Sequence, residues 1–393
     1  MPNRPAPRAA LLLLALALSA APPENGPHTE TWPNGKKKLE ARYKDGKPDG
    51  DHTEYFESGA KKLHARYRKG VLHGSYVEYA DDGKTVRNEV WRDGILAYPR
   101  PLADIQRTIA LLKPQTMTRG PMFIVAPSPK SPIAAGTLAP AALQAALAQL
   151  KIYRYLAGVP WEDITPNNRY NQEAQHGAVL LAILGRLNHT PPKPDGVSEE
   201  FYKTAHAGTS HGNLAQGMGS LVTAITGWMN DSDPGNIAAL GHRRWCLNPP
   251  MKETGFGNCG DFNIIWAHDA ARKETPDYDF IPFPVRGYHP VAYFQSDWAW
   301  HVSLNPKKYQ KPDKNKARAK IFPLDPAGNK ARDPLPLNYE SVNNTGYGIP
   351  ACVIFRPDTI RVSPGARYTV ELEGIQDAAG ADTRVEYFVE FCK

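Results

Sequence analysis

The segment from Gly241 to Pro249 holds the side chain best suited to chemistry. It reads Gly-His-Arg-Arg-Trp-Cys-Leu-Asn-Pro, so a histidine follows a glycine and an Asn-Pro pair stops a short apolar turn. We interpret it as a short helix that begins at His242 and leads into a strand. A histidine in a first helical turn faces the positive end of the helix dipole, which disfavours the protonated ring and leaves it free to ligate a metal. We expect the chemistry of this chain to lie near His242.

Other patterns in the chain are weaker candidates. Ser210 and His211 could suggest a hydrolase pair, but adjacent residues rarely present their side chains to each other as nucleophile and base. His206 and His211 are better explained as loop or helix-surface residues. The sequence contains no His-Glu-x-x-His and no Gly-x-x-x-x-Gly-Lys-Ser/Thr phosphate-binding loop. No complete catalytic set is therefore visible in the sequence.

The elements that would position His242 follow from hydrophobic periodicity. Apolar residues recur at helical spacing in residues 143–153, 168–187 and 217–229. Strand patterns follow at residues 254–258 and 262–267. The fold class that we predict for this central region, residues 141–286, is α+β, with helices packed against a small antiparallel sheet.

The first residues predict export. Arg4 and Arg8 precede an apolar run from Ala9 to Leu18, and small residues follow. This is the pattern of a signal peptide, here residues 1–21, and the run is too short to span a bilayer as a stable helix. An uncleaved anchor is the alternative. No other stretch is long and apolar enough to cross a membrane, so we expect a secreted, periplasmic or cell-envelope protein without a transmembrane segment.

Residues 30–97 contain an internal repeat with a period of 24 residues. Leu-Glu-Ala-Arg-Tyr at residues 39–43 recurs as Leu-His-Ala-Arg-Tyr at residues 63–67, and glycines keep the same spacing. Each unit predicts two short strands joined by a turn, and a fixed period predicts stacked β-hairpins. The pattern resembles MORN-like repeats. Such a sheet could be a binding surface or a spacer, and a Pro-rich connector follows at residues 98–140.

Residues 287–393 are rich in strand patterns separated by Pro and Gly turns, which predicts an antiparallel β-sandwich similar to Ig-like modules. Four cysteines fit an exported protein. Three pairings are possible, and we favour Cys246 with Cys259 and Cys352 with Cys392 because each pair falls within one predicted domain. A metal site of all four cysteines is disfavoured, because the chain has no Cys-x-x-Cys.

The composition of the chain gives no indication of a binding partner. The net charge of +7 comes from basic residues that are mostly dispersed among acids, and no nucleic-acid-binding motif is present. We therefore expect no nucleic-acid partner.

The order of short motifs across residues 143–268 resembles the CAP superfamily (cysteine-rich secretory proteins, antigen 5 and plant pathogenesis-related proteins). This resemblance implies an α-β-α sandwich for the central domain. Residues 150–160 look like the first helix of the family, and Leu187-Asn188-His189 resembles its histidine after the second helix. The other matches are Gly212-Asn213-Leu214-Ala215 with Gly-Glu-Asn-Leu-Ala, Trp228-Met229-Asn230-Asp231 with Trp-x-x-Glu, Gly241-His242-Arg243 with Gly-His-Arg and Gly255-Phe256-Gly257 with Gly-Val-Gly.

The resemblance also implies a ligand-binding cleft, because two histidines and two acids line a cleft in the family and some members bind a divalent metal there. Carried over to this chain, the metal-binding side chains are His189, Asp231 and His242, with His211 and Asn213 beside them. The second acid has no counterpart, since Gly212 stands at its position. Two imidazoles and one carboxylate would make a three-ligand zinc site with an open position. The alternative is a set of hydrogen-bonded polar residues that fixes loops.

Three functions are compatible with these patterns. The first is a secreted CAP-domain protein that uses the cleft for binding or adhesion, with a small ligand, a lipid or a peptide or protein partner. The second is a divalent-metal-dependent hydrolase that acts on peptides or cell-wall material. The third is a structural envelope protein with a vestigial cleft.

Overall fold

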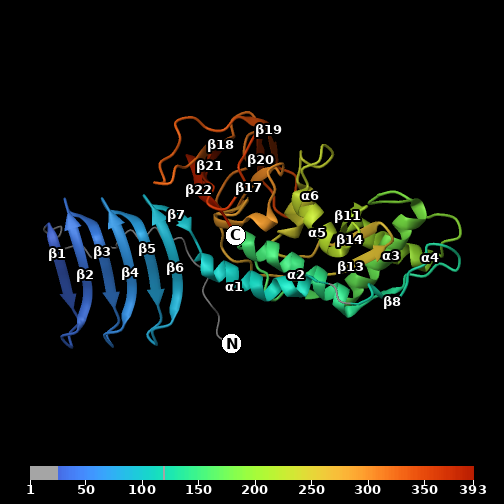
Figure 1. Cartoon of the computed structure of the whole chain (residues 1–393), viewed down its shortest axis with the longest axis horizontal. Helices are drawn as coiled ribbons and strands as arrows, with labels where there is room; N and C mark the ends of the chain where they lie inside the picture. The colour runs from blue at the N-terminus through green and yellow to red at the C-terminus, as the bar shows by residue number, and fades with distance from the viewer. Residues whose placement is uncertain (1–24, 118–119) are drawn as a thin grey trace.

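The computed structural model describes residues 25–117 and 120–393, so the predicted signal peptide lies outside the described residues. The chain forms several separate sheets together with helices, which is the expected multidomain α+β class. Figure 1 shows an extended sheet at one end, a helical region with a small sheet at the other, and a β-rich region between them. No helix in the described ranges is long and apolar enough to cross a membrane.

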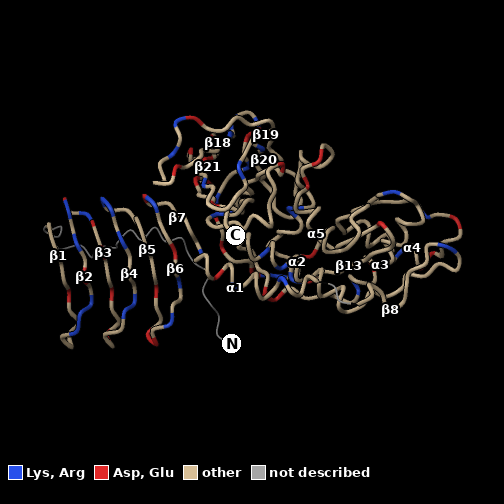
Figure 2. Tube along the Cα trace, viewed as in Figure 1, with Lys and Arg blue, Asp and Glu red and all other residues tan. Residues whose placement is uncertain are grey.

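The N-terminal sheet has seven strands that follow one another in sequence order. Every second connection between consecutive strands is a two-residue turn. Both turn residues have positive φ, as at Asp45 (51°) and Gly46 (70°). Such turns match the twist of a hairpin. Figure 2 shows basic and acidic residues side by side across this sheet. The strands are β1 Gly26–Thr31, β2 Lys37–Lys44, β3 Lys47–Tyr55, β4 Lys61–Arg68, β5 Val71–Tyr79, β6 Thr85–Arg92 and β7 Ile95–Tyr98.

The repeat period is visible as a ladder of ring pairs on one face of this sheet. His28 packs against Tyr43, His52 against Tyr67 and Tyr76 against Trp91. The last strand is attached to the β-rich region, because the Tyr98 hydroxyl donates to Glu390 over 2.5 Å and its ring lies 4.5 Å from that of Tyr288. The sheet is thereby fixed to the rest of the chain.

The predicted Pro-rich connector contains more regular structure than its composition indicates. Helix α1 (Leu102–Leu112) continues into the 3-10 turn η1 (Lys113–Thr116), and a short hairpin pairs β8 (Phe123–Val125) with β9 (Thr137–Leu138). Helix α2 (Pro140–Ala157) then runs back beside α1, with Pro140 in its first turn and Gly158 in the left-handed conformation at its end.

The central region confirms the predicted helices and adds one. Its helices are α3 (Asn168–Leu184), α4 (Glu199–Ser210), α5 (Leu221–Asn230) and α6 (Gly241–Cys246). Three antiparallel strands in the order β11 (Gly212–Gln216), β14 (Phe262–Trp266) and β13 (Phe256–Cys259) form its sheet, and β10 (Thr165–Pro166) pairs with β12 (Glu253–Thr254). Helix α4 and strand β11 were not predicted from the sequence.

The glycines around β13 allow helix α3 to lie directly on that strand. A Cβ atom on Gly255 would sit 2.2 Å from the carbonyl carbon of Tyr170, and one on Gly257 would sit 2.1 Å from the carbonyl oxygen of Ala174. Both distances are far inside van der Waals contact. The Gly-Phe-Gly segment therefore has a packing role, which requires no ligand.

Two four-stranded sheets make up the C-terminal part, in the orders β15-β17-β20-β19 and β16-β22-β21-β18. Strand β16 runs parallel to β22, so the sandwich is mixed, whereas an antiparallel one was expected. Its first strand, β15, precedes the expected boundary at residue 287. The strands are β15 Phe280–Phe283, β16 Gly287–Pro290, β17 Trp300–Leu304, β18 Arg318–Pro323, β19 Leu337–Asn343, β20 Cys352–Pro357, β21 Arg367–Gln376 and β22 Asp382–Cys392.

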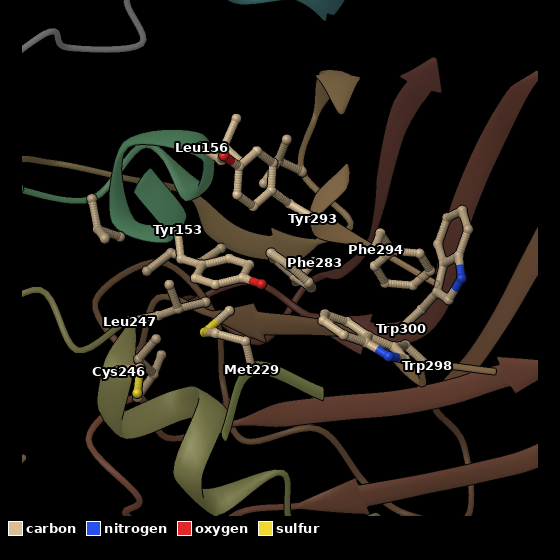
Figure 3. Packing of buried hydrophobic residues seen from close by; sticks show 14 of the residues in the cluster. Tyr153, Leu156, Met229, Cys246, Leu247, Phe283, Tyr293, Phe294, Trp298 and Trp300 are labelled. Atoms are coloured by element: carbon tan, nitrogen blue, oxygen red, sulfur yellow. The ribbon is translucent and has the colours of Figure 1, made fainter. Parts of the chain in front are cut away.

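One hydrophobic core, which we call the main core, runs from the helices into the sandwich. Tyr153 of α2, Met229 of α5 and Leu247 after α6 pack in the same cluster as Phe283 and Trp300 of the sandwich. Figure 3 shows these side chains converging between the helices and the strands. The central and C-terminal parts are therefore packed as one body.

The expected disulfides are not formed in this structure, where Cys246, Cys259, Cys352 and Cys392 are all buried free thiols. Cys246 belongs to the main core, whereas Cys259 lies in a second cluster under α3 and Cys352 in a third. Cys246 and Cys259, which were expected to pair, therefore lie in different hydrophobic clusters.

Candidate functional site

His242 is paired with Asp231. The Asp231 Oδ1 atom lies 2.7 Å from Nδ1 of the ring, and Oδ2 accepts the backbone N–H of His242 over 2.9 Å. Asp231 ends α5 in the left-handed conformation, with φ of 47°, and its carboxylate is buried. The pairing assigns the Nδ1 proton to the Asp231 side and leaves Nε2 of the neutral ring as an acceptor.

The electrostatics of His242 differ from the expectation drawn from the helix dipole. Burial favours the neutral ring, but the hydrogen bond and the negative charge of Asp231 outweigh it, so the pKa of His242 is raised above its usual value. The six residues of α6 form a short helix, and the carboxylate is in direct contact with the ring. The nearby full charge therefore decides the protonation state.

Two arginines after His242 fix α6 to the sandwich. Arg243 is fully buried and donates to the backbone oxygens of Met229, Asn230 and Ala299. Arg244 is also fully buried and donates to the oxygens of Ile349 and Thr345. These carbonyls belong to α5, to a loop of the sandwich and to the residue before β17. The two arginines therefore hold the Gly-His-Arg segment, and His242 with it, at the junction of the helices and the sandwich.

The other expected cleft residues lie on the neighbouring strand and loops. The Nδ1 atom of His189 is 3.0 Å from the Thr209 carbonyl oxygen, and that of His211 is 3.0 Å from the Ala207 oxygen. The side-chain amide of Asn213 donates to the backbone oxygen of His242 over 2.9 Å. Asn213 thus connects β11 to α6 as a buried structural residue, whereas His189 and His211 are exposed.

A stack of five rings connects these parts, and we call it the ring stack. Tyr170 stacks on Trp266 at 4.5 Å, and Trp266 stacks on His211 at 4.8 Å. The edge of His268 contacts His211 at 5.7 Å, and its face stacks on Trp245 at 3.9 Å. Trp245 lies one helical turn after His242. The ring stack therefore extends from α3 to the helix that carries His242.

Two members of this region, His268 and Glu173, were missed by sequence reasoning. His268 lies near His211 and His189, and burial together with these two imidazoles lowers its pKa to about 4. Burial raises the pKa of Glu173 against the opposing charge of Arg169, which lies 3.6 Å from Oε1, and the Oε2 atom has no hydrogen-bond partner among the described residues. The Nε1–H group of the buried Trp266 lacks an acceptor as well. Such contacts between distant segments leave no local signal in a sequence.

The predicted zinc ligands are not assembled into one site. Within residues 25–117 and 120–393, no group of three or more His, Cys, Asp and Glu side chains is arranged to hold a metal ion. Asp231 is used by His242, while the imidazole of His189 is anchored on Thr209 and neighbours His268 instead. The structure joins His242 with Asp231, and it groups His189 with His211 and His268.

Ser210 and His211 do contact each other, since Oγ lies 3.0 Å from Nδ1. The Ser210 hydroxyl also donates to the His206 oxygen over 2.7 Å, and the His211 Nδ1 faces the Ala207 oxygen. Both groups are thus engaged as donors to helix carbonyls, which leaves the imidazole unable to remove the serine proton. This pair closes the end of α4.

Comparisons with protein-family models, with curated proteins and with solved structures give no significant match to the chain.

Proposed function

We propose that the chain is a secreted, CAP-like binding protein and that its ligand contacts the ring stack and the neighbouring imidazoles. The observation that carries this proposal is the continuous stack of Tyr170, Trp266, His211, His268 and Trp245. Aromatic faces offer apolar contact area, and imidazoles add hydrogen-bonding atoms to it. A peptide or a small ligand with a flat apolar face and polar edges would use both.

Two buried polar atoms support this assignment. The Trp266 Nε1–H and the Glu173 Oε2 have no partner among the described residues. A buried polar atom without a hydrogen bond costs about 1–3 kcal/mol, so a ligand or water that satisfies it would be favoured. Arg169 adds a cation close to the same place, because its guanidinium lies 5.0 Å from the Tyr170 ring.

Histidine NMR tests the proposal directly. Short peptides, cell-wall glycopeptide fragments and fatty acids would be titrated into the full-length protein while the ring signals are followed. We expect the His211 and His268 signals to shift together with one ligand class, and the affinity to fall at least about tenfold in His211→Ala. His176→Ala is a matched control on α3, because this half-buried ring contacts Phe201 outside the ring stack. If His211→Ala binds as wild type does, the ligand does not use the stack.

A metal-dependent hydrolase is the second candidate. The Nδ1 atoms of His189 and His211 each face a carbonyl oxygen, which leaves their Nε2 atoms available. Metal-binding histidines are commonly oriented by such a contact. Zinc analysis of the purified protein tests this candidate together with melting in added zinc. Absence of bound zinc, with an unchanged melting temperature in its presence, would exclude it.

A further inference from the structure

The segment between the repeat sheet and α2 exposes an unusual amount of apolar side chain. Leu111 is 66% exposed, Met117 69%, Ile124 67% and Val125 55%. These four residues lie within 15 positions of each other, on the end of α1, after η1 and on β8. Isolated exposed apolar side chains are ordinary, but a run of them on one surface marks an interaction site. We call residues 105–117 and 120–138 the connector surface.

All charged residues of the connector surface are basic. From Ile105 to Trp161 the sequence contains no Asp or Glu, although Arg107, Lys113 and Lys130 lie in its first part. Arg107 pairs with Asp104 over 2.6 Å, whereas the exposed Lys113 and Lys130 make no ion pair with any residue of the described ranges. The repeat sheet differs, because its basic residues alternate with acids (Figure 2).

The elements that carry these residues share one side of the molecule. In Figure 1, α1 and β8 both lie along the lower edge, with α2 running between them. Helix α1 turns Ile105 and Leu112 into the main core and leaves Leu111 outside. The exposed apolar residues are therefore additional to those that attach the helix.

We propose that the connector surface binds the surface of an anionic lipid bilayer. Exposed aliphatic side chains can enter the boundary between headgroups and acyl chains, while lysines beside them meet anionic headgroups. Charge distinguishes this occupant from a second copy of the chain, since pairing two connector surfaces would bring lysines together without any acid from the same segment to neutralise them. Binding on this side would hold the central region against the bilayer.

The test is flotation of the full-length protein with lipid vesicles. One set is made of phosphatidylcholine alone, and the other of phosphatidylcholine and phosphatidylglycerol in a ratio of about three to one. The anionic lipid should strengthen electrostatic binding. We expect binding to the anionic vesicles that weakens as salt is added. Leu111→Ser combined with Ile124→Ser should lower the partition coefficient about tenfold, through the lost apolar contact. Lys113→Gln should lower it about fivefold.

Val86→Ser is the matched control. Val86 is 68% exposed, as much as Ile124, but it stands on β6 of the repeat sheet, so its variant should bind as wild type does. All variants retain the apolar run at residues 9–18, so any contribution of that run cancels in the comparison. Thermal melting monitored by circular dichroism checks that each variant is folded.

Three results would overturn the proposal. They are equal binding to both kinds of vesicle, unchanged binding of the Leu111→Ser, Ile124→Ser variant, and no binding of wild type to anionic vesicles. A wild-type protein that is dimeric by gel filtration and becomes monomeric in the double variant would assign the connector surface to self-association instead.

Discussion

Asp231 binds His242 twice, through the ring nitrogen Nδ1 at 2.7 Å and through the backbone nitrogen at 2.9 Å. The same carboxylate faces the backbone N–H of the buried Arg243 at 3.3 Å. One acid therefore sets the tautomer of His242 and receives the first N–H groups of α6. This explains why an aspartate that ends α5 in a left-handed conformation lies beside His242.

Asp231→Asn should lower the pKa of His242, because the amide keeps the shape of the side chain and its tolerance of the left-handed backbone but loses the negative charge. In wild type the raised pKa adds stability that is fully present below about pH 6.5 and is lost as the pH rises through the folded-state pKa. The variant should therefore lose about 1–3 kcal/mol, with the larger deficit at acidic pH. Histidine NMR titration and urea unfolding measure both effects. Asp195→Asn, at an exposed site without an ion pair to any described residue, is the control.

His268 should have the opposite pH dependence. Its pKa is lowered to about 4, so protonation favours the unfolded chain and stability falls as the pH drops from about 6.5 towards 4. His268→Gln removes this titration, and the fall in its unfolding free energy over the same range should be smaller than that of wild type. Urea unfolding at several pH values makes the comparison. An NMR pKa near the ordinary value would contradict the desolvation of this ring by its stacking on Trp245.

Arg243 should be among the most sensitive positions of the chain. Its guanidinium donates to the oxygens of Met229, Asn230 and Ala299 in a fully buried setting. Arg243→Met leaves three carbonyls without donors and should cost about 3 kcal/mol or more of unfolding free energy. Chemical denaturation measures the loss, and Arg66→Met, at a side chain that is 65% exposed, should change stability by less than about 0.5 kcal/mol. Equal effects at both positions would show that Arg243 does not join α5 to the sandwich.

Hydrophobic periodicity predicted the helices that bury apolar faces, and it failed where packing depends on small residues. Helix α4 was missed because its contact with α3 is made through Gly208, where a Cβ atom would lie 2.0 Å from the Glu173 backbone oxygen. A glycine contact adds no apolar residue to the pattern. Strand β11 was missed for a related reason, since its pairing with β14 is a contact between segments about 50 residues apart.

The candidate site was predictable in part. The Gly-His-Arg segment led to His242, and Asp231 was expected beside it. The ring stack was not foreseen, because Tyr170, His211 and His268 come from three separate segments whose side chains meet only in the folded chain. The predicted zinc ligands are not grouped in the described residues for the same reason: residue types can be read from a sequence, whereas the contact that already uses a carboxylate cannot.

Gly257→Ala tests the close packing of α3 on β13. The added methyl group would lie 2.1 Å from the Ala174 oxygen, so the helix must move or the strand must distort. We expect a loss of more than about 3 kcal/mol of unfolding free energy, measured by denaturant titration. Gly158→Ala is not a clean control because its φ of 73° is itself strained in alanine, but Gly346→Ala has open space around the new atom and should be close to neutral. A stable Gly257→Ala protein would mean that α3 stands further from the strand.

The last prediction concerns the four thiols. It tests whether they are free, as in the structure, or form the disulfides expected of an exported chain. Burial raises the pKa of Cys246 to about 12 and that of Cys392 to about 11, so these groups remain as unreactive thiols at neutral pH. We expect no reaction of the native protein with an aromatic disulfide reagent and four reactive thiols after unfolding. Mass spectrometry of protein recovered from an oxidising compartment should find the same reduced mass. Two reactive thiols or none after unfolding would require pairs between cores that the structure keeps apart, and the packing of Cys246 and Cys352 would then have to be revised.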